Sequence, residues 1–219
     1  MGQSAYPTAA QLTTFLSGAG VTMAADFDET AAVNGAADEF ERRIRRILLA
    51  PAGAVNRRYD PPVTPSNVLV LDRDLATVTS VVYQPEGGSA ETLVRDTDFW
   101  LLGNPGDVEV EPFAVSWWGV RFLRRWSLPL GGAVYRSLRI TGRWGYATTI
   151  PDDAWQAILE LAAVGAVASY ATDQVQEGLV RYAAAGVEKL WSEDPLRGVM
   201  RRWQGRVDAA VGRYVRLEV

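Results

Sequence analysis

Two pairs of acidic residues are the first candidates for catalysis in this sequence. Asp96 and Asp98, and likewise Glu109 and Glu111, stand two residues apart, so on a strand both members of a pair would share one face. A glycosidase needs two carboxyl groups across a sugar, one of them with a raised pKa. Nothing near either pair supplies such a pKa difference, and the pattern is more typical of the solvated face of a half-exposed strand.

The sequence contains no histidine and no cysteine among its 219 residues. The commonest general base, the Ser-His-Asp relay, thiolate nucleophiles and the usual transition-metal ligands are therefore missing. Carboxylates, tyrosines, hydroxyl groups and Lys189 remain for any chemistry. We expect a protein that is not an enzyme, with no catalytic residue, no cofactor and no metal.

Charge and hydropathy limit the kinds of partner that the protein can bind. The formal net charge is −4, which argues against tight sequence-independent DNA binding, because such binding needs many cations facing phosphate. No apolar run approaches the roughly 18 residues that would indicate a membrane span, and the N-terminus lacks the basic-then-apolar order of a secretory signal. We expect no membrane contact and synthesis in the cytoplasm.

Arginine and tryptophan indicate contacts with other proteins. Of the 22 basic residues only Lys189 is a lysine, and there are eight tryptophans. Trp and Arg are enriched at the energetic centres of protein interfaces, although a coding bias toward arginine also explains the composition. The candidate residues for a subunit interface are Arg42, Arg43, Arg45, Arg46 and Trp203.

Two other roles stay open for these residue types. The four clustered arginines end a predicted helix, where they could compensate the helix dipole or contact phosphates. Trp117, Trp118 and Trp126 could serve as stacking platforms in a carbohydrate-binding β module. That alternative requires the three rings to lie coplanar and exposed along one groove.

Helical periodicity occurs at both ends of the chain. Residues 8–11 have the form of a capping box, and a short helix is expected to follow. Apolar residues recur at helical spacing over 28–49, and again after 150–153, where Pro151 suits the first helical turn and two aspartates suit the positive helix end. A last helix is expected to open at 194–195.

Between these parts the pattern changes to alternation, beginning near Ser66. Turn sequences at 85–88 and 104–107 separate short alternating segments. The predicted strands are 68–71, 77–83, 92–95, 98–102, 108–110, 120–126 and 135–144. This spacing predicts an antiparallel β meander or small barrel.

The fold class that follows is α+β. A helical core is expected from residues 1–66 and 145–219, with the β unit at 67–144 inserted between them. The two helical parts need each other to bury their apolar faces.

One stretch carries a family resemblance. Residues 138–146 read Leu-Arg-Ile-Thr-Gly-Arg-Trp-Gly-Tyr, and residues 149–158 read Thr-Ile-Pro-Asp-Asp-Ala-Trp-Gln-Ala-Ile. This stretch resembles the head-tail connector (adaptor) proteins of tailed double-stranded DNA bacteriophages, in which a strand ending in such a turn leads through a proline-containing helix start into a core helix. The matching residues are Gly142, Trp144, Gly145, Tyr146 and Pro151.

The resemblance implies a structural role in the virion, at the head-tail interface. It implies a homo-oligomeric, dodecameric ring beneath the phage portal protein that continues the DNA channel without holding DNA tightly. A downstream neck, stopper or tail protein would bind the lower face of the ring. Another phage neck or tail ring protein is the alternative.

The end of the chain alternates in a way that predicts a docking strand. No following turn supplies a hairpin partner, so the backbone donors of this segment must find a sheet edge elsewhere. In the connector family the portal supplies that edge, and pairing with the protein's own β unit is the alternative. The candidate portal-docking residues are Tyr214, Val215, Arg216, Leu217, Glu218 and Val219.

Overall fold

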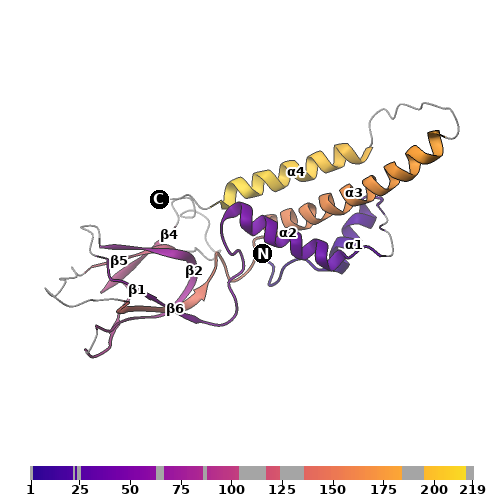
Figure 1. Cartoon of the computed structure of the whole chain (residues 1–219). Helices are drawn as coiled ribbons and strands as arrows, with labels where there is room; N and C mark the ends of the chain where they lie inside the picture. Colours follow the sequence, from indigo (N-terminus) through magenta and orange to yellow (C-terminus); the bar gives the residue numbers. More distant parts are fainter. Residues whose placement is uncertain are drawn as a thin grey trace. The chain divides into compact units, whose positions relative to one another are not determined.

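The computed structural model describes the chain except for residues 1, 22, 24–25, 63–66, 86–87, 104–116, 124–135, 184–194 and 216–219. Two compact units are present (Figure 1). We call Met1–Arg45 with Ile150–Val219 the helical unit, and Arg46–Thr149 the sheet unit. The four helices and the antiparallel sheet of the described residues confirm the α+β class.

The helical unit begins with two helices whose starts are set by local sequence. α1 (Ala9–Gly18) starts with the expected capping box, in which Thr8 and Gln11 cap each other's backbone N–H groups. α2 (Glu29–Ile44) starts where the Asp28 carboxylate accepts the Ala31 N–H at 2.9 Å. α2 ends five residues before the expected limit of 49, because Arg45 adopts a left-handed conformation with φ 56°.

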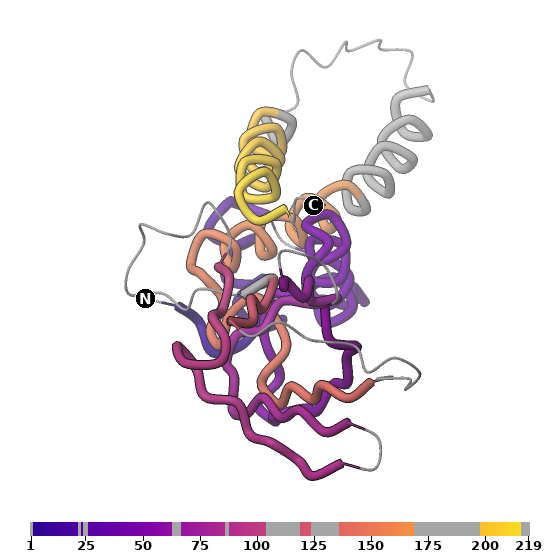
Figure 2. The backbone as a smooth tube through the Cα atoms, turned by 90° about the vertical axis from the view of Figure 1, so that its left-hand side faces the viewer, coloured from indigo at the N-terminus to yellow at the C-terminus, as the bar shows by residue number. Residues whose placement is uncertain are grey.

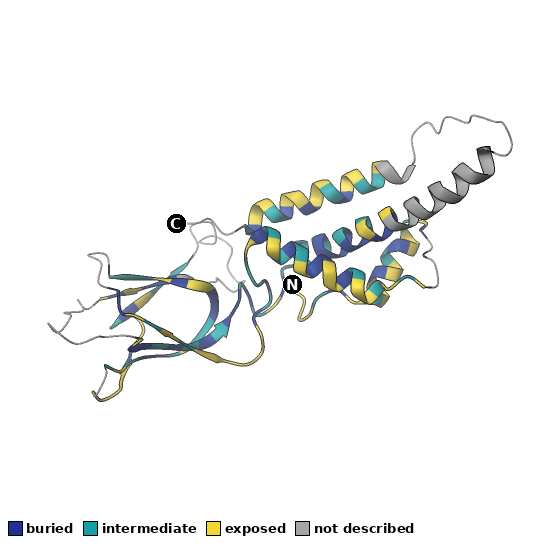
Figure 3. Cartoon of the chain, in the orientation of Figure 1, coloured by how far each residue is buried: buried dark blue, intermediate teal, exposed yellow. Residues whose placement is uncertain are grey.

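Two longer helices complete this unit. α3 (Asp152–Ala183) packs against α1, α2 and α4 (Pro195–Tyr214), and the views of Figures 1 and 2 both show α3 and α4 side by side. Their buried faces join those of α1 and α2 in one core. This core includes Leu12, Leu16, Val33, Phe40, Ile44, Ile158, Val167, Trp203 and Val207 (Figure 3).

The sheet unit is built on one long central strand. β2 (Val68–Tyr83) joins two of the expected strands, and β1 (Val55–Tyr59), β3 (Glu91–Leu93), β4 (Phe99–Gly103), β5 (Trp117–Phe122) and β6 (Leu138–Trp144) surround it. The order is β1-β6-β2-β5-β4, with β3 also on β2 and every pair antiparallel. The last strand therefore lies between the first two. The expected strand at 108–110 lies outside the described residues.

The sheet unit begins earlier in the chain than the change of hydrophobic pattern indicated. Residues 46–62 belong with the sheet and not with the helices. The reason is β1, which pairs with β6 over its whole length, from Val55 opposite Gly142 to Tyr59 opposite Leu138. A short strand on an edge carries little alternation of its own, so its partner decides where it belongs.

Gly142 allows β2 to bend across β6. The register between these strands shifts twice, between Leu75 and Thr77 and again between Val78 and Ser80, as β-bulges require. A Cβ at Gly142 would lie 2.1 Å from the Thr77 carbonyl oxygen. The bulged backbone therefore occupies the space that any other residue at this position would need.

We predict that Gly142→Ala lowers the free energy of unfolding of the sheet unit by about 2–3 kcal/mol, because the added methyl group forces backbone apart. Gly53→Ala is the matched control, since a Cβ at exposed Gly53 meets nothing within 4 Å. Urea unfolding followed by tryptophan fluorescence measures both variants. Equal stabilities for the two variants would contradict this reading of β2.

Candidate interaction surfaces

Trp144 fastens the last strand to the edge strand β1. Its side chain is buried, and its indole Nε1 donates to the Val55 carbonyl oxygen at 2.8 Å. The Arg57 guanidinium lies 4.9 Å from the centre of its ring, a cation–π contact. Asp72 accepts from both Arg57 and Tyr59, and burial together with this carboxylate raises the pKa of Tyr59 above its usual range.

Gly145 and Tyr146 join the end of β6 to the segment before β1. A Cβ at Gly145 would lie 2.7 Å from the Ala50 Cα, so the two backbones meet closely. The Tyr146 N–H donates to the Ile47 carbonyl at 2.7 Å, and the Ala50 N–H donates to the Ala147 carbonyl at 2.8 Å. Glycine is thus required here for backbone packing.

The same junction holds a buried ion pair. Arg46 and Asp74 side chains are 6% and 2% exposed, and their Nε and Oδ2 atoms lie 3.5 Å apart. The guanidinium also lies 5.1 Å from the centre of the Tyr146 ring. Arg46 was expected at a subunit interface, but its side chain is enclosed in the sheet unit because it neutralises a buried carboxylate.

Pro151 stands one residue before α3, so it precedes the first turn that it was expected to occupy, and its carbonyl accepts the Trp155 N–H at 2.9 Å. Asp153 lies in the first turn, as expected, and binds the end of α4. It accepts hydrogen bonds from Arg213 and from the Tyr214 hydroxyl, the latter at 2.5 Å. Tyr214 was expected in a docking segment, but its side chain is buried within the helical unit of its own chain.

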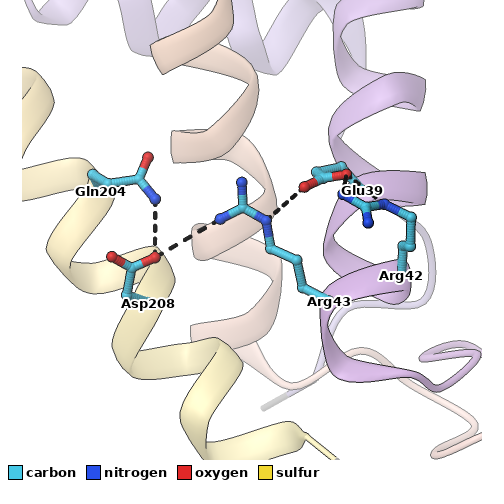
Figure 4. A network of polar contacts seen from close by, with 5 residues as sticks. All are labelled: Glu39, Arg42, Arg43, Gln204 and Asp208. Carbon is cyan, nitrogen blue, oxygen red and sulfur yellow. Dashed lines mark hydrogen bonds and ion pairs between the residues drawn. The ribbon is translucent and has the colours of Figure 1, made fainter.

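The remaining arginines of the cluster differ in their surroundings. Arg42 and Arg43 both bind Glu39 on α2 (Figure 4), at 2.8 and 2.7 Å from their Nε atoms. These two hydrogen bonds hold the pKa of Glu39 below its usual range. Arg43 also reaches Asp208 of α4 at 3.8 Å. Arg45 is exposed at the end of α2, so the four residues do not form one patch.

Trp203, another expected interface residue, lies inside the helical unit. It is 5% exposed, and its ring centre lies 5.1 Å from that of Phe15 on α1. The apolar stripe of α4 packs within the chain, and Trp203 belongs to that stripe. Trp203 therefore offers no surface for a neighbouring subunit.

An ion pair that was not anticipated joins buried Glu160 of α3 to exposed Arg206 of α4. Glu160 is 1% exposed, and its Oε1 lies 2.8 Å from Arg206 Nε and 3.0 Å from Gln156 Nε2. The hydrogen bond that Arg206 donates to the Glu160 carboxylate raises the pKa of Arg206. The signal in the sequence was a carboxylate within an otherwise apolar stripe, between Leu159 and Leu161.

The acidic pairs do not assemble an active site in the described part of the chain. Asp98 accepts the Val94 N–H at 2.7 Å in a tight turn, and Asp96 has φ 65° in that turn. Glu109, Glu111 and Trp126 lie outside the described residues, as do the side chains of Trp117 and Trp118. No group of acidic residues that could hold a metal occurs among the residues that the structure describes.

No helix in the described ranges is both long and apolar enough to cross a bilayer.

Comparisons with known proteins give a similarity of structure only. No protein-family model and no curated protein sequence matches the chain. The whole chain is similar to a chain from the virion of a native gene transfer agent particle, of which it covers 96%, with 15% identity and a TM-score of 0.48. A chain from the neck of the empty particle gives the same identity and coverage and a TM-score of 0.47. The roles of individual residues therefore rest on contacts within this chain.

We predict that Arg46→Ala lowers the free energy of unfolding of the sheet unit by about 3 kcal/mol, because Asp74 is left buried without its cation. Arg58→Ala on β1 is the matched control, since Arg58 is exposed, and it should cost less than about 0.5 kcal/mol. Denaturant unfolding measures both. A cost for Arg46→Ala as small as that of the control would contradict the role of this ion pair.

Proposed function

We propose that this chain is a structural head-to-tail connector (adaptor) subunit of a tailed bacteriophage. Copies of the chain form a ring beneath the portal, continue the DNA channel and join the head to a downstream neck, stopper or tail protein. The ring is dodecameric, lies at the head-tail interface of the virion, and has no catalytic role.

The segment 142–151 carries this proposal. Gly142 and Gly145 are each required by close backbone approach, and Trp144 fastens β6 to β1. Pro151 directly precedes α3. In connector proteins the same residue types stand between a strand and a core helix. The segment therefore resembles them in its position between β6 and α3 as well as in its amino-acid sequence.

The charge of the chain suits a channel through which DNA passes without being held. A net charge of −4 for each copy leaves no excess of cations to displace counterions from the phosphates. DNA can pass rapidly only if it binds weakly to the lining of the channel. The net negative charge of the chain agrees with that requirement.

Native mass spectrometry of the purified chain, with electron microscopy of the large species, tests the ring. We expect one closed ring with a central channel wide enough for duplex DNA, in the mass range of about twelve copies. A chain that stays monomeric at micromolar to millimolar concentration, alone and with portal rings, would refute the connector proposal.

The C-terminal segment is the part that we propose docks on the portal. Tyr214 anchors its start, and the Val215 N–H still continues the helix by donating to Val211 at 2.9 Å. Residues 216–219 lie outside the described residues. If the segment docks on the portal, the helical unit should be equally stable with and without it.

We therefore predict that deleting residues 216–219 leaves the unfolding midpoint unchanged and abolishes co-sedimentation with portal rings. Tyr214 supplies the control, because Tyr214→Phe removes the hydrogen bond to Asp153 and should cost about 1 kcal/mol of stability without changing portal binding. Loss of stability in the truncated chain would favour the alternative, in which the C-terminal segment pairs with the β unit of its own chain. Normal portal binding by the truncated chain would refute docking.

A further inference from the structure

α4 buries one face and exposes a line of glycines on the other. Its buried side consists of Trp203, Val207, Ala210 and Tyr214. Gly198, Gly205 and Gly212 are exposed and follow one another at seven-residue intervals, which is about two helical turns. They therefore form one line along the side of α4 that faces away from the core of the helical unit.

The described part of the chain gives no packing reason for these glycines. A Cβ built at any of the three meets nothing within 4 Å. Glycine inside a helix is less stable than alanine at the same position, because it loses more backbone freedom on folding. A line of glycine on an exposed helix face allows another backbone to approach closely, and this benefit requires a second molecule.

Unpaired positive charge borders the glycine line. α4 carries five arginines and one aspartate, a net charge of +4. Arg206 and Arg213 bind Glu160 and Asp153 of α3. Arg201 and Arg202 are exposed and make no hydrogen bond or ion pair with the described part of the chain. The exposed face of α4 is thus basic, and the residues that the structure describes supply no partner for these two cations.

The exposed face of α2 carries an acidic residue and a glycine, and Arg42, which binds Glu39, lies at its C-terminal end. Ala31, Gly35 and Asp38 are exposed and lie on the side away from buried Phe40. A Cβ at Gly35 also meets nothing within 4 Å. Asp38 has no ion pair among the residues that the structure describes. α2 as a whole carries four acidic residues and two arginines, a net charge of −2.

We infer that the glycine face of α4 packs against the Ala31-Gly35-Asp38 face of α2 in a second copy of this chain, with Arg201 and Arg202 placed around Asp38. Two α4 helices facing each other would bring their arginines together, which like-charge repulsion disfavours. A contact between two different faces repeats from copy to copy and closes a ring when the rotation allows. The inference rests on the proposed connector ring and identifies the faces that join its subunits.

Charge reversal across this contact is the direct test. Arg201→Glu and Asp38→Arg should each raise the chain concentration needed for half-assembly at least about tenfold, measured by sedimentation velocity and native mass spectrometry. The double variant Arg201→Glu with Asp38→Arg should recover most of the assembly, because the pair is restored with its signs exchanged. Asp26→Arg, the same charge change at another exposed position, should assemble like the wild type.

The glycine line provides a second test in which stability and assembly move in opposite directions. Gly205→Ala should raise the Tm by roughly 2–4 °C, because alanine favours helix. Gly205→Leu should keep or raise the Tm while blocking the close approach and preventing ring formation. Gly18→Leu on α1, another exposed glycine with open space around it, should leave assembly unchanged.

The outcomes separate this inference from the connector proposal. A wild-type ring that survives Arg201→Glu, Asp38→Arg and Gly205→Leu would overturn the inference and leave the connector proposal standing. A wild-type chain that forms no ring under any condition would overturn both. Loss of assembly in both single charge variants without recovery in the double variant would overturn the pairing of α4 with α2.

Discussion

The backbone at the end of β6 lies directly against the backbone of residues 47–50, and much of the sheet unit depends on this approach. Gly145 meets Ala50 without a side chain between them, and Tyr146 and Ala147 exchange backbone hydrogen bonds with the facing segment. Because the segment is held here, Arg46 reaches Asp74. The following residues then enter the sheet as β1, where Trp144 binds the carbonyl of Val55. This one backbone contact thus determines the positions of Arg46, of β1 and of Trp144.

Features governed by near neighbours in the chain could be read from the sequence. The capping box at Thr8, the start of α2 at Asp28 and the start of α3 beside Pro151 depend on residues within one helical turn. The alternation of β6 was readable for the same reason, since every second residue from Leu138 to Trp144 is buried. The motif segment was predictable as a strand-to-helix connection, and the structure adds which backbone each glycine faces.

Features that depend on distant partners could not be read in this way. Residues 72–74 look like a polar turn between two strands, yet β2 continues through them because Asp72 and Asp74 have cationic partners on other segments. The arginine cluster shows the same limit. One left-handed residue, Arg45, ends α2 and turns Arg46 away from Arg42 and Arg43. Four neighbours in sequence therefore have separate roles, and no local pattern distinguishes them.

The two units differ in how much of the chain must exist before each can form. The sheet unit is one uninterrupted stretch, 46–149, whereas the helical unit takes its residues from both ends. During synthesis α1 and α2 are made before the sheet unit, but α3 and α4, which pack against α2, are made after it. All residues of the sheet unit are therefore synthesised before the helices that pack against α1 and α2. The helical core closes only after α3 and α4 have been made, by which time every residue of the sheet unit is already present.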